Sequence, residues 1–273
     1  MHFTKMQGCG NDYVYVNCFE PENKNIKEPE KLAQIISDRH FGVGSDGLIL
    51  IEPSNKADAF MNMFNADGSK AMMCGNGIRC TAKYIYDHGI VQGSRKKVDI
   101  DTRAGVKNIE LDIVNNKVVS ATVDMGIAKL SSDLPEDIFI KNMALKFIGV
   151  DIGNPHAVYF LEDNGILTGL DYMPMGKCFE NHARFPDRVN SEFIEIMSRD
   201  EIKMRVWERG SGETFACGTG AAASAFAGFS AGKLNNEVLV HLLGGDLKIK
   251  IMPDNRCYMT GPAVEVFEGD FDY

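Results

Sequence analysis

One short segment occurs twice in this chain, and the repeat constrains the fold more than any other feature. The first copy, Asn65–Gly77, carries Cys74 in the order Cys-Gly-Asn-Gly, and the second, Glu208–Gly220, carries Cys217 in the order Cys-Gly-Thr-Gly. Both copies follow an alternating, strand-like segment and precede a segment with helical periodicity. The sequence therefore predicts each cysteine in a glycine-flanked loop at the start of a helix.

The repeat extends beyond the cysteines. At the offset of 143 residues that separates Cys74 from Cys217, Gly10–Asn11 aligns with Gly153–Asn154, and the neighbouring strands coincide without a gap. Chance similarity between short strands explains this less well, because glycine and cysteine positions align too. We interpret the pattern as an internal duplication. It predicts two similar halves related by an approximate twofold axis, with equivalent loops facing one shared cleft.

Most of the remaining pattern is typical of strands. One principal helix after each repeated loop predicts an α+β (mixed α/β) fold rather than a regular βαβ series. Apolar spacing predicts helices at Pro29–Arg39, Cys74–His88 and Thr219–Ala231. Strands are predicted at Phe3–Met6, Tyr13–Phe19, Leu48–Glu52, Ala59–Asn65, Val98–Thr102, Val106–Val114, Lys117–Met125, Leu145–Val150, Ala157–Leu161, Phe193–Ser198, Lys203–Glu208, Leu239–Leu242, Leu247–Met252, Cys257–Thr260 and Ala263–Phe267.

Charge and hydropathy exclude several classes of function. The chain has 273 residues, enough for one large domain or two ordinary ones, and a net charge of −9. It has no basic stripe to neutralise phosphates, so we expect no nucleic-acid partner. Residues 1–18 lack the apolar core of a signal peptide, and the apolar segment 221–231 is too short to cross a bilayer. No membrane association is expected.

Cysteine usage indicates a reducing compartment. Seven cysteines, an odd number with no Cys-x-x-Cys pair, favour free thiols in a cytoplasmic protein and argue against a bound metal such as zinc. A structural disulfide between Cys74 and Cys217 would be unusual there but stays open as an alternative. The other five are assigned to buried or ordinary positions: Cys9, Cys18, Cys80, Cys178 and Cys257.

Two cysteines at helix starts indicate acid–base chemistry. Free N–H groups and the helix dipole at such a position can lower a thiol pKa from about 8.5 to about 3.5–7.5. The same N–H groups bind carboxylates. If Cys74 and Cys217 face each other, one thiolate can remove a proton from a carbon while the opposite thiol delivers another, which inverts that carbon. The helix N-termini would stabilise the carboxylate as it takes on enolate character.

Other polar residues near the repeated loops are weaker candidates. His156 lies in the duplicated Gly-Asn-Pro-His segment, where it could relay protons or tune a thiol. Glu208 and Arg209 open the second cysteine loop. Gly42–Gly47 fits Gly-x-Gly-x-x-Gly, but it follows a helix and enters a strand, the reverse of a dinucleotide-binding site, so we interpret it as a turn.

Taken together, these segments resemble the diaminopimelate epimerase family over nearly the whole chain. Each motif alone is weak, but the set is specific. The motifs are Lys5–Asp12, Arg39–Gly47, Phe64–Ser69, Met73–Cys80, Gly153–Ala157, Arg188–Asn190, Glu208–Thr214 and Ala216–Gly220.

The resemblance implies an isomerase that interconverts LL- and meso-2,6-diaminopimelate without pyridoxal phosphate or another cofactor, on the route to lysine and peptidoglycan. Cys74 and Cys217 would be its two bases. Gly75–Asn76 and Gly218–Thr219 would hold the carboxylate at the reacting carbon. His156 and Glu208 would tune thiol protonation or contact substrate amines. The rest of the substrate would be held by Asn11, Asn65, Asn154, Asn190, Glu208 and Arg209.

The resemblance also implies an architecture. Each half would wrap a curved, mainly antiparallel sheet around a central helix, and the protein would form a homodimer. We expect residues 1–117 with a returning strand at 262–273 in one half, residues 118–261 in the other, and the active site in the cleft between them. Gly47 departs from the family pattern, because some members carry a glutamine there, close to the substrate.

Two further readings stay open. The same mechanism could act on another amino acid, such as lanthionine or histidine. Alternatively, the chain could be a non-catalytic binding protein for a small carboxylate, which would explain the helix starts but leave the twin cysteines without a role.

Overall fold

Two helices of 13 residues begin directly after the repeated cysteines in the computed structural model, which describes residues 1–93, 95–141, 143–161 and 173–273. Helix α2 spans Gly75–Asp87 and helix α5 spans Gly218–Ser230, so the offset of 143 holds at both ends. Both predicted helices are thus confirmed, with the cysteines as their N-caps. No helix among the described residues is long and apolar enough to cross a membrane.

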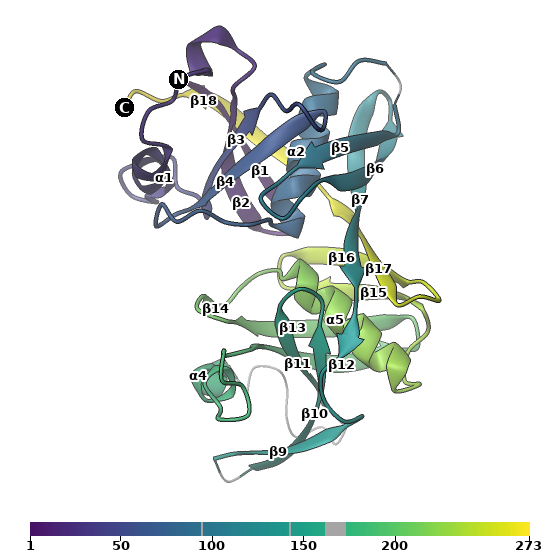
Figure 1. Cartoon of the computed structure of the whole chain (residues 1–273). Helices are drawn as coiled ribbons and strands as arrows, with labels where there is room; N and C mark the ends of the chain where they lie inside the picture. Colours follow the sequence, from purple (N-terminus) through teal and green to yellow (C-terminus); the bar gives the residue numbers. More distant parts are fainter. Residues whose placement is uncertain (94, 142, 162–172) are drawn as a thin grey trace. The chain divides into compact units, whose positions relative to one another are not determined.

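The chain folds into two compact units (Figure 1). The first comprises Met1–Val123 and Gly261–Tyr273, and the second Asp124–Thr260. Strand β7 (Lys117–Ile127) carries the chain out of the first unit, and strand β17 (Arg256–Pro262) carries it back. The sequence predicts boundaries at 117–118 and 261–262, whereas the two units divide at 123–124 and 260–261.

In the first unit the strands are hydrogen-bonded in the order β18-β1-β2-β3-β4-β5-β6-β7. The β2–β3 and β4–β5 pairs are parallel and the others antiparallel. The bounds are β1 His2–Gly8, β2 Asn11–Asn17, β3 Gly47–Glu52, β4 Ala59–Asn65, β5 Lys97–Asp101, β6 Lys107–Val114 and β18 Val264–Asp270, with a 3-10 turn at Pro21–Asn23.

The second unit repeats this topology. Its order is β8-β10-β11-β12-β13-β15-β16-β17, with β11–β12 and β13–β15 parallel and the others antiparallel. Strand β9 also pairs with β10, and β14 with β13. The bounds are β8 Lys129–Leu130, β9 Glu136–Ile140, β10 Met143–Asp151, β11 Pro155–Phe160, β12 Asn190–Ser198, β13 Glu201–Glu208, β14 Gly212–Glu213, β15 Glu237–Leu242 and β16 Gly245–Ile251. The predicted mixed α/β fold with two similar halves is confirmed.

Each repeated helix is enclosed by its own sheet. Helix α2 contacts β1, β2, β4, β5 and β6, and α5 contacts β10, β11, β12, β15 and β16. Residues 76–85 of α2 and 220–228 of α5 are all buried. A helix buried on every side needs small or apolar residues, and α5 meets this requirement with five alanines within Ala221–Ala227. The sheets therefore hold the helix starts, and with them the cysteines, in fixed places.

The opposite face of each sheet is covered by a second helix. In the first unit, Leu32 and Ile36 of α1 (Pro29–Ser37) pack with Val14 and Leu48. In the second unit a 3-10 turn at Met173–Met175 and the short α4 (Gly176–Glu180) occupy this face. There Phe179 joins an aromatic cluster with Phe147, Tyr159 and Phe193.

Candidate active site

Cys74 is the N-cap of α2 and contacts Asn11, a predicted substrate-binding residue. Its backbone is extended, and its sulfur accepts a hydrogen bond from the Gly77 N–H at 3.4 Å. The thiol donates to Oδ1 of Asn11 at 3.2 Å. Gly75 and Asn76 form the first turn beyond it, where N–H groups lack intrahelical partners.

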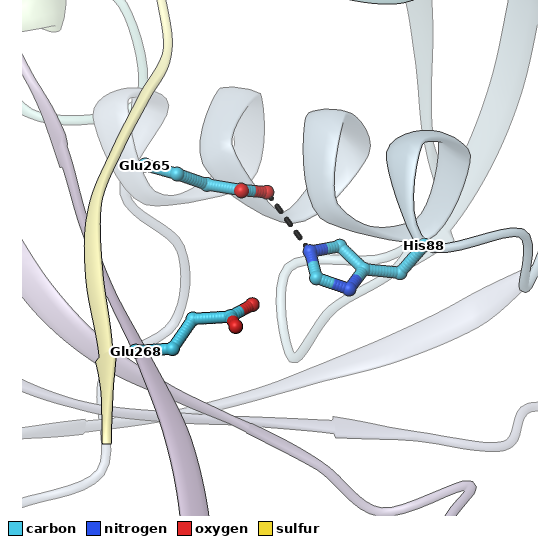
Figure 2. A group of neighbouring side chains, drawn as sticks. All are labelled: His88, Glu265 and Glu268. Atoms are coloured by element: carbon cyan, nitrogen blue, oxygen red, sulfur yellow. Dashed lines mark hydrogen bonds and ion pairs between the residues drawn. The ribbon is translucent and has the colours of Figure 1, made fainter.

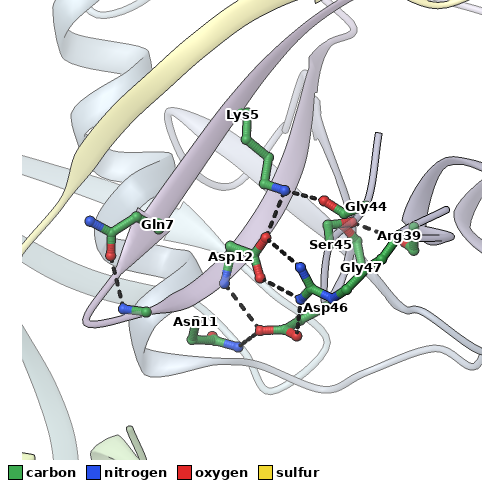
Figure 3. A network of polar contacts seen from close by, with 11 residues as sticks. Lys5, Gln7, Asn11, Asp12, Arg39, Gly44, Ser45, Asp46 and Gly47 are labelled. Carbon is green, nitrogen blue, oxygen red and sulfur yellow. Dashed lines mark hydrogen bonds and ion pairs between the residues drawn. The ribbon is translucent and has the colours of Figure 1, made fainter. Parts of the chain in front are cut away.

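The orientation of the Asn11 amide is set by Asp46. Asp46 Oδ2 accepts from Asn11 Nδ2 at 2.7 Å and from the Asp12 N–H at 3.1 Å (Figure 3). An ionised carboxylate can only accept, so the amide nitrogen of Asn11 must face Asp46. Its oxygen is then left for the Cys74 thiol.

Two basic side chains neutralise these acids. Arg39 donates to Asp12 Oδ1 at 2.8 Å and to Asp46 Oδ1 at 3.0 Å. Lys5 lies 2.6 Å from Asp12 Oδ2 and also donates to the Gly44 carbonyl (Figure 3). Burial raises the pKa of Asp12, but hydrogen bonds from Arg39 and Lys5 outweigh it, and the net pKa is lowered. Asp12 is therefore ionised at neutral pH.

Two other predicted residues of the first unit, Asn65 and Asn76, lie at the end of β4 and in the first turn of α2. Asn65 ends β4 opposite Gly47 on β3, and its amide donates to Ser69 Oγ at 2.9 Å. Asn76 is buried, and its Oδ1 has no hydrogen-bond partner among the described residues. A Cβ on Gly47 would lie 2.1 Å from the Phe64 carbonyl oxygen, so a glutamine here would displace backbone.

Cys217 is the N-cap of α5, as Cys74 is of α2, but carboxylates lie near its sulfur. Its sulfur accepts from the Gly220 N–H at 3.4 Å and lies 3.5 Å from Thr219 Oγ1. It also hydrogen-bonds the Glu208 carboxylate, which accepts from the Thr214 hydroxyl. Cys217 is buried, whereas Cys74 is partly exposed.

The pKa of the Cys217 thiol is raised well above its usual range. Burial is the largest cause, followed by the charges of Glu208 and Glu192, against which the hydrogen bonds from Thr219 and Gly220 act more weakly. The pKa of Glu208 is also raised by burial. The helix start predicts a lowered thiol pKa; at Cys217 this prediction is wrong, because burial and two nearby carboxylates oppose it. Cys217 therefore rests as a neutral thiol.

Three of the predicted residues form a chain of contacts that leads to Cys217. His156 Nδ1 lies 2.7 Å from Glu192 Oε1, and its Nε2 lies 3.0 Å from Asn154 Oδ1. The Asn154 amide donates to Thr219 Oγ1 at 3.4 Å. Thr219 in turn contacts the Cys217 sulfur.

Asn190 and Arg209 stand apart from that chain. The Asn190 amide donates to the Pro155 carbonyl and accepts from the Arg209 N–H, both at 2.9 Å. Asn190 thus ties β11 and β12 to the end of β13. The Arg209 guanidinium is exposed and donates to the Asp187 carbonyl at 3.1 Å.

The sequence did not single out Asp46 or Glu192. Asp46 lies in the glycine-rich segment that was interpreted only as a turn. Glu192 is fully buried within β12, in a run of five buried residues from Asn190 to Ile194. A glutamate directly before the apolar strand residues Phe193 and Ile194 was the signal that could have drawn attention to it, because buried carboxylates need partners.

One further group of side chains could in principle approach a cation. His88, Glu265 and Glu268 place their ligand atoms within 4.8 Å of one another (Figure 2). His88 is the C-cap of α2, at the opposite end of the helix from Cys74. Its Nε2 already pairs with Glu265 Oε1 at 3.0 Å, so we assign this group no part in the chemistry at the cysteines.

The fold places the protein in a broad structural class. It resembles a solved structure described as a probable proline racemase from Agrobacterium radiobacter K84, with a TM-score of 0.73 and 14% identity, covering 99% of this chain and 92% of that one. The protein thus has the two-unit fold seen in that probable racemase, with a cysteine capping the central helix of each unit.

The family follows from sequence comparison. The family model described as diaminopimelate epimerase matches residues 3–131 and 148–266. A protein of Agathobacter rectalis named diaminopimelate epimerase is 49% identical over all of this chain and 99% of its own length. One of Acetivibrio thermocellus with the same name is 46% identical over all of this chain and 99% of its own length. The chain belongs to the diaminopimelate epimerase family.

Proposed function

We propose that this protein interconverts LL- and meso-2,6-diaminopimelate by a two-base mechanism that needs no pyridoxal phosphate. It would act as an isomerase in lysine and peptidoglycan precursor synthesis. The observation that carries the proposal is the pair of cysteines that cap equivalent central helices, α2 and α5, in matched register. Each thiol lies where N–H groups can hold a carboxylate.

The mechanism assigns one proton transfer to each thiol. A thiolate takes the α-proton, and the electrons of the broken C–H bond delocalise into the carboxylate, which the helix N–H groups stabilise. The opposite thiol then gives its proton to the other face of the carbon. Because the pKa of Cys217 is raised, Cys217 rests as a thiol and is the proton donor in one direction, in which Cys74 acts as the base after it has given up its own proton. In the reverse direction the roles exchange.

The remaining residues would hold the substrate. The chemistry requires both thiols to reach opposite faces of one carbon, so we propose that the two cysteine loops share one cleft in the active enzyme. Gly75–Asn76 and Gly218–Thr219 would bind the reacting carboxylate. Asn11, Asn65, Asn154, Asn190, Glu208 and Arg209 would select the distal amino-acid end.

We further propose a cytoplasmic homodimer. The seven cysteines lie outside disulfides, which suits a reducing compartment. Strand β18 exposes Val266 and Phe267, with 55% and 48% of their surface accessible, and such an apolar strand suits contact with a second copy. Light scattering of the purified protein tests this assembly, and a monomer mass would exclude it.

Turnover of purified LL-diaminopimelate tests the function. We expect wild-type protein to form the meso isomer, and Cys74→Ala and Cys217→Ala to lose turnover while remaining folded. Lanthionine and histidine serve as competing substrates, and preferential turnover of either would reassign the substrate. A protein that binds diaminopimelate without any exchange of its α-proton would instead be a binding protein.

A further inference from the structure

The second unit contains a buried ionisable pair under the start of α5. His156 Nδ1 and Glu192 Oε1 lie 2.7 Å apart, and both side chains are 0% exposed. Glu192 Oε2 has no hydrogen-bond partner within the described parts of the chain. A buried ion pair is rarely more stabilising than apolar residues of similar size. Stability alone therefore does not explain this pair.

The first unit shows that the fold does not need a buried ionisable pair at this place. At the offset of 143, Tyr13 takes the place of His156 and Ile49 the place of Glu192. The strand registers agree, because Tyr15 pairs with Ile49 and Val158 with Glu192.

The side chains of Ile49 and Glu192 also reach equivalent points, beneath the first turn of α2 and of α5 respectively. A Cβ on Gly77 would lie 3.0 Å from Ile49 Cδ1, and one on Gly220 would lie 2.7 Å from Glu192 Oε1. The same position thus accepts an aliphatic side chain in one unit and a carboxylate in the other.

The contacts of His156 define its protonation. Nδ1 faces a carboxylate oxygen of Glu192, and Nε2 faces the amide oxygen of Asn154. Both partners present acceptor oxygens, and a ring with a proton on each nitrogen satisfies both contacts. The Asn154 amide oxygen is then occupied, and its nitrogen is the atom that donates to Thr219 Oγ1. The Thr219 hydroxyl proton is left free to point at the Cys217 sulfur, 3.5 Å away.

We propose that Glu192 is a positioning residue that keeps His156 doubly protonated and so directs the hydrogen bonds through Asn154 and Thr219 toward the Cys217 sulfur. Without the carboxylate, a neutral His156 would accept from the Asn154 amide. Asn154 would turn over and take the Thr219 proton, and the sulfur would lose that donor. The catalytic part of this inference rests on the proposed role of Cys217 as one of the two acid–base groups.

The charges around Cys217 make this donor important. Glu208 on β13 and Glu192 on β12 disfavour the thiolate, and His156 on β11 faces the Glu192 carboxylate. The Thr219 hydroxyl is one of two contacts that lower the pKa of Cys217. The Glu192 charge itself disfavours the thiolate, so a loss of turnover on its removal comes from the lost donor and not from the lost charge.

The ring nitrogens of His156 provide a readout that does not depend on activity. In ¹⁵N-histidine-labelled wild-type protein, assigned with His156→Asn, we expect both nitrogens of His156 to give imidazolium signals at pH 7.5. In Glu192→Gln we expect the signals of a neutral ring. A neutral His156 in the wild type, or an imidazolium in Glu192→Gln, would overturn the proposal.

Turnover provides the second readout, with a matched control. We expect Glu192→Gln to lower kcat about 10–100-fold with little change in KM, because orientation rather than binding is lost. Glu195→Gln changes an exposed glutamate of the same strand and should leave kcat unchanged. Glu192→Ile copies the first unit at this strand position but leaves His156 buried without its partner, so it should be less stable than wild type and show the same loss of turnover. Full turnover in a folded Glu192→Ile protein would contradict the proposal.

The two proposals can fail separately. If wild-type protein does not epimerise diaminopimelate, the proposed function fails, while the ¹⁵N signals still decide the protonation of His156. If wild-type protein is active and Glu192→Gln keeps full kcat, only the role of Glu192 is wrong.

Discussion

The Cys74 thiol and the Asn11 amide oxygen lie 3.2 Å apart, with the thiol as donor. The Asn11 amide cannot turn over freely, because its nitrogen donates to Asp46 at 2.7 Å. The Asp46 carboxylate therefore decides that the oxygen, and not the nitrogen, of the Asn11 amide faces Cys74. In the second unit Glu192 acts on Asn154, the residue equivalent to Asn11, by way of His156. The two units thus fix equivalent amides with carboxylates from non-equivalent positions.

Replacing Asp46 should impair turnover by releasing Asn11. We expect Asp46→Ala to lower kcat/KM about 10–100-fold, or about 1.4–2.7 kcal/mol. Asn11→Ala should lose a similar amount, and the double variant should be little worse than either single one, because both changes remove one interaction. Steady-state kinetics measures this. Asp112→Ala, at an exposed aspartate of β6, is the control. Additive losses in the double variant would show that Asp46 acts independently of Asn11.

Alanine at two equivalent glycines should have unequal effects. A Cβ at position 220 meets the Glu192 carboxylate at 2.7 Å and the Cys217 sulfur at 3.2 Å, whereas one at position 77 meets the flexible tip of Ile49 at 3.0 Å and lies 3.6 Å from the Cys74 Cβ. We therefore expect Gly220→Ala to reduce turnover at least about tenfold more than Gly77→Ala. Parallel assays and thermal unfolding of both variants would measure this, and equal losses would contradict the assigned geometry.

The raised pKa of Cys217 predicts how the thiol reacts. Because burial and the charges of Glu208 and Glu192 disfavour the thiolate, alkylation of Cys217 by iodoacetamide should rise only above the pH range of an ordinary thiol, about 8–9. Glu208→Gln removes one of these charges, so its alkylation profile should move to lower pH. Peptide-resolved mass spectrometry follows Cys217 alone, and Glu213→Gln is the control on the neighbouring strand β14. An unchanged profile in Glu208→Gln would mean that burial alone sets the pKa.

The lowered pKa of Asp12 predicts a pH-dependent contribution to stability. Its folded-state pKa lies below the unfolded value of about 3.9, so the contribution is present above that pH and is lost as the pH falls through the folded pKa. We expect Asp12→Asn to lower the free energy of unfolding by roughly 2 kcal/mol at pH 7, because Lys5 is left buried without its partner. Below about pH 4 the difference should shrink.

Urea unfolding at several pH values measures this contribution. Glu110→Gln, in an exposed pair with Lys97, should change stability by less than about 1 kcal/mol. A deficit in Asp12→Asn that stays constant between pH 3 and pH 7 would show that packing, and not the carboxylate charge, is responsible.

The parts of the fold that are determined by residues close together in the sequence could be predicted. The starts of α2 and α5 followed from glycine-flanked cysteines before periodic apolar residues. The short helix α4 was missed because five residues are too few to show helical periodicity. Strand β9 was missed as well; it follows a proline and opens with two acidic residues, which is unusual for a strand.

The cysteines and most of their predicted neighbours could be identified from motifs and from the repeat. The roles of Asp46 and Glu192 could not, because they depend on contacts between strands far apart in the sequence. Glu192 meets His156 only through the register of β11 with β12. The raised pKa of Cys217 was missed for the same reason, since Glu208 and Glu192 lie on two different strands.

The fate of the α-proton in deuterium oxide tests the two-thiol mechanism most directly. LL-diaminopimelate is incubated with wild-type protein, and the label at the α-carbon is measured in substrate and product during the first few per cent of conversion. Two bases predict that the meso product carries solvent deuterium at the inverted carbon while the remaining LL substrate keeps its hydrogen. A product that retains the original hydrogen would show that a single base returns it, and would contradict the roles assigned to Cys74 and Cys217.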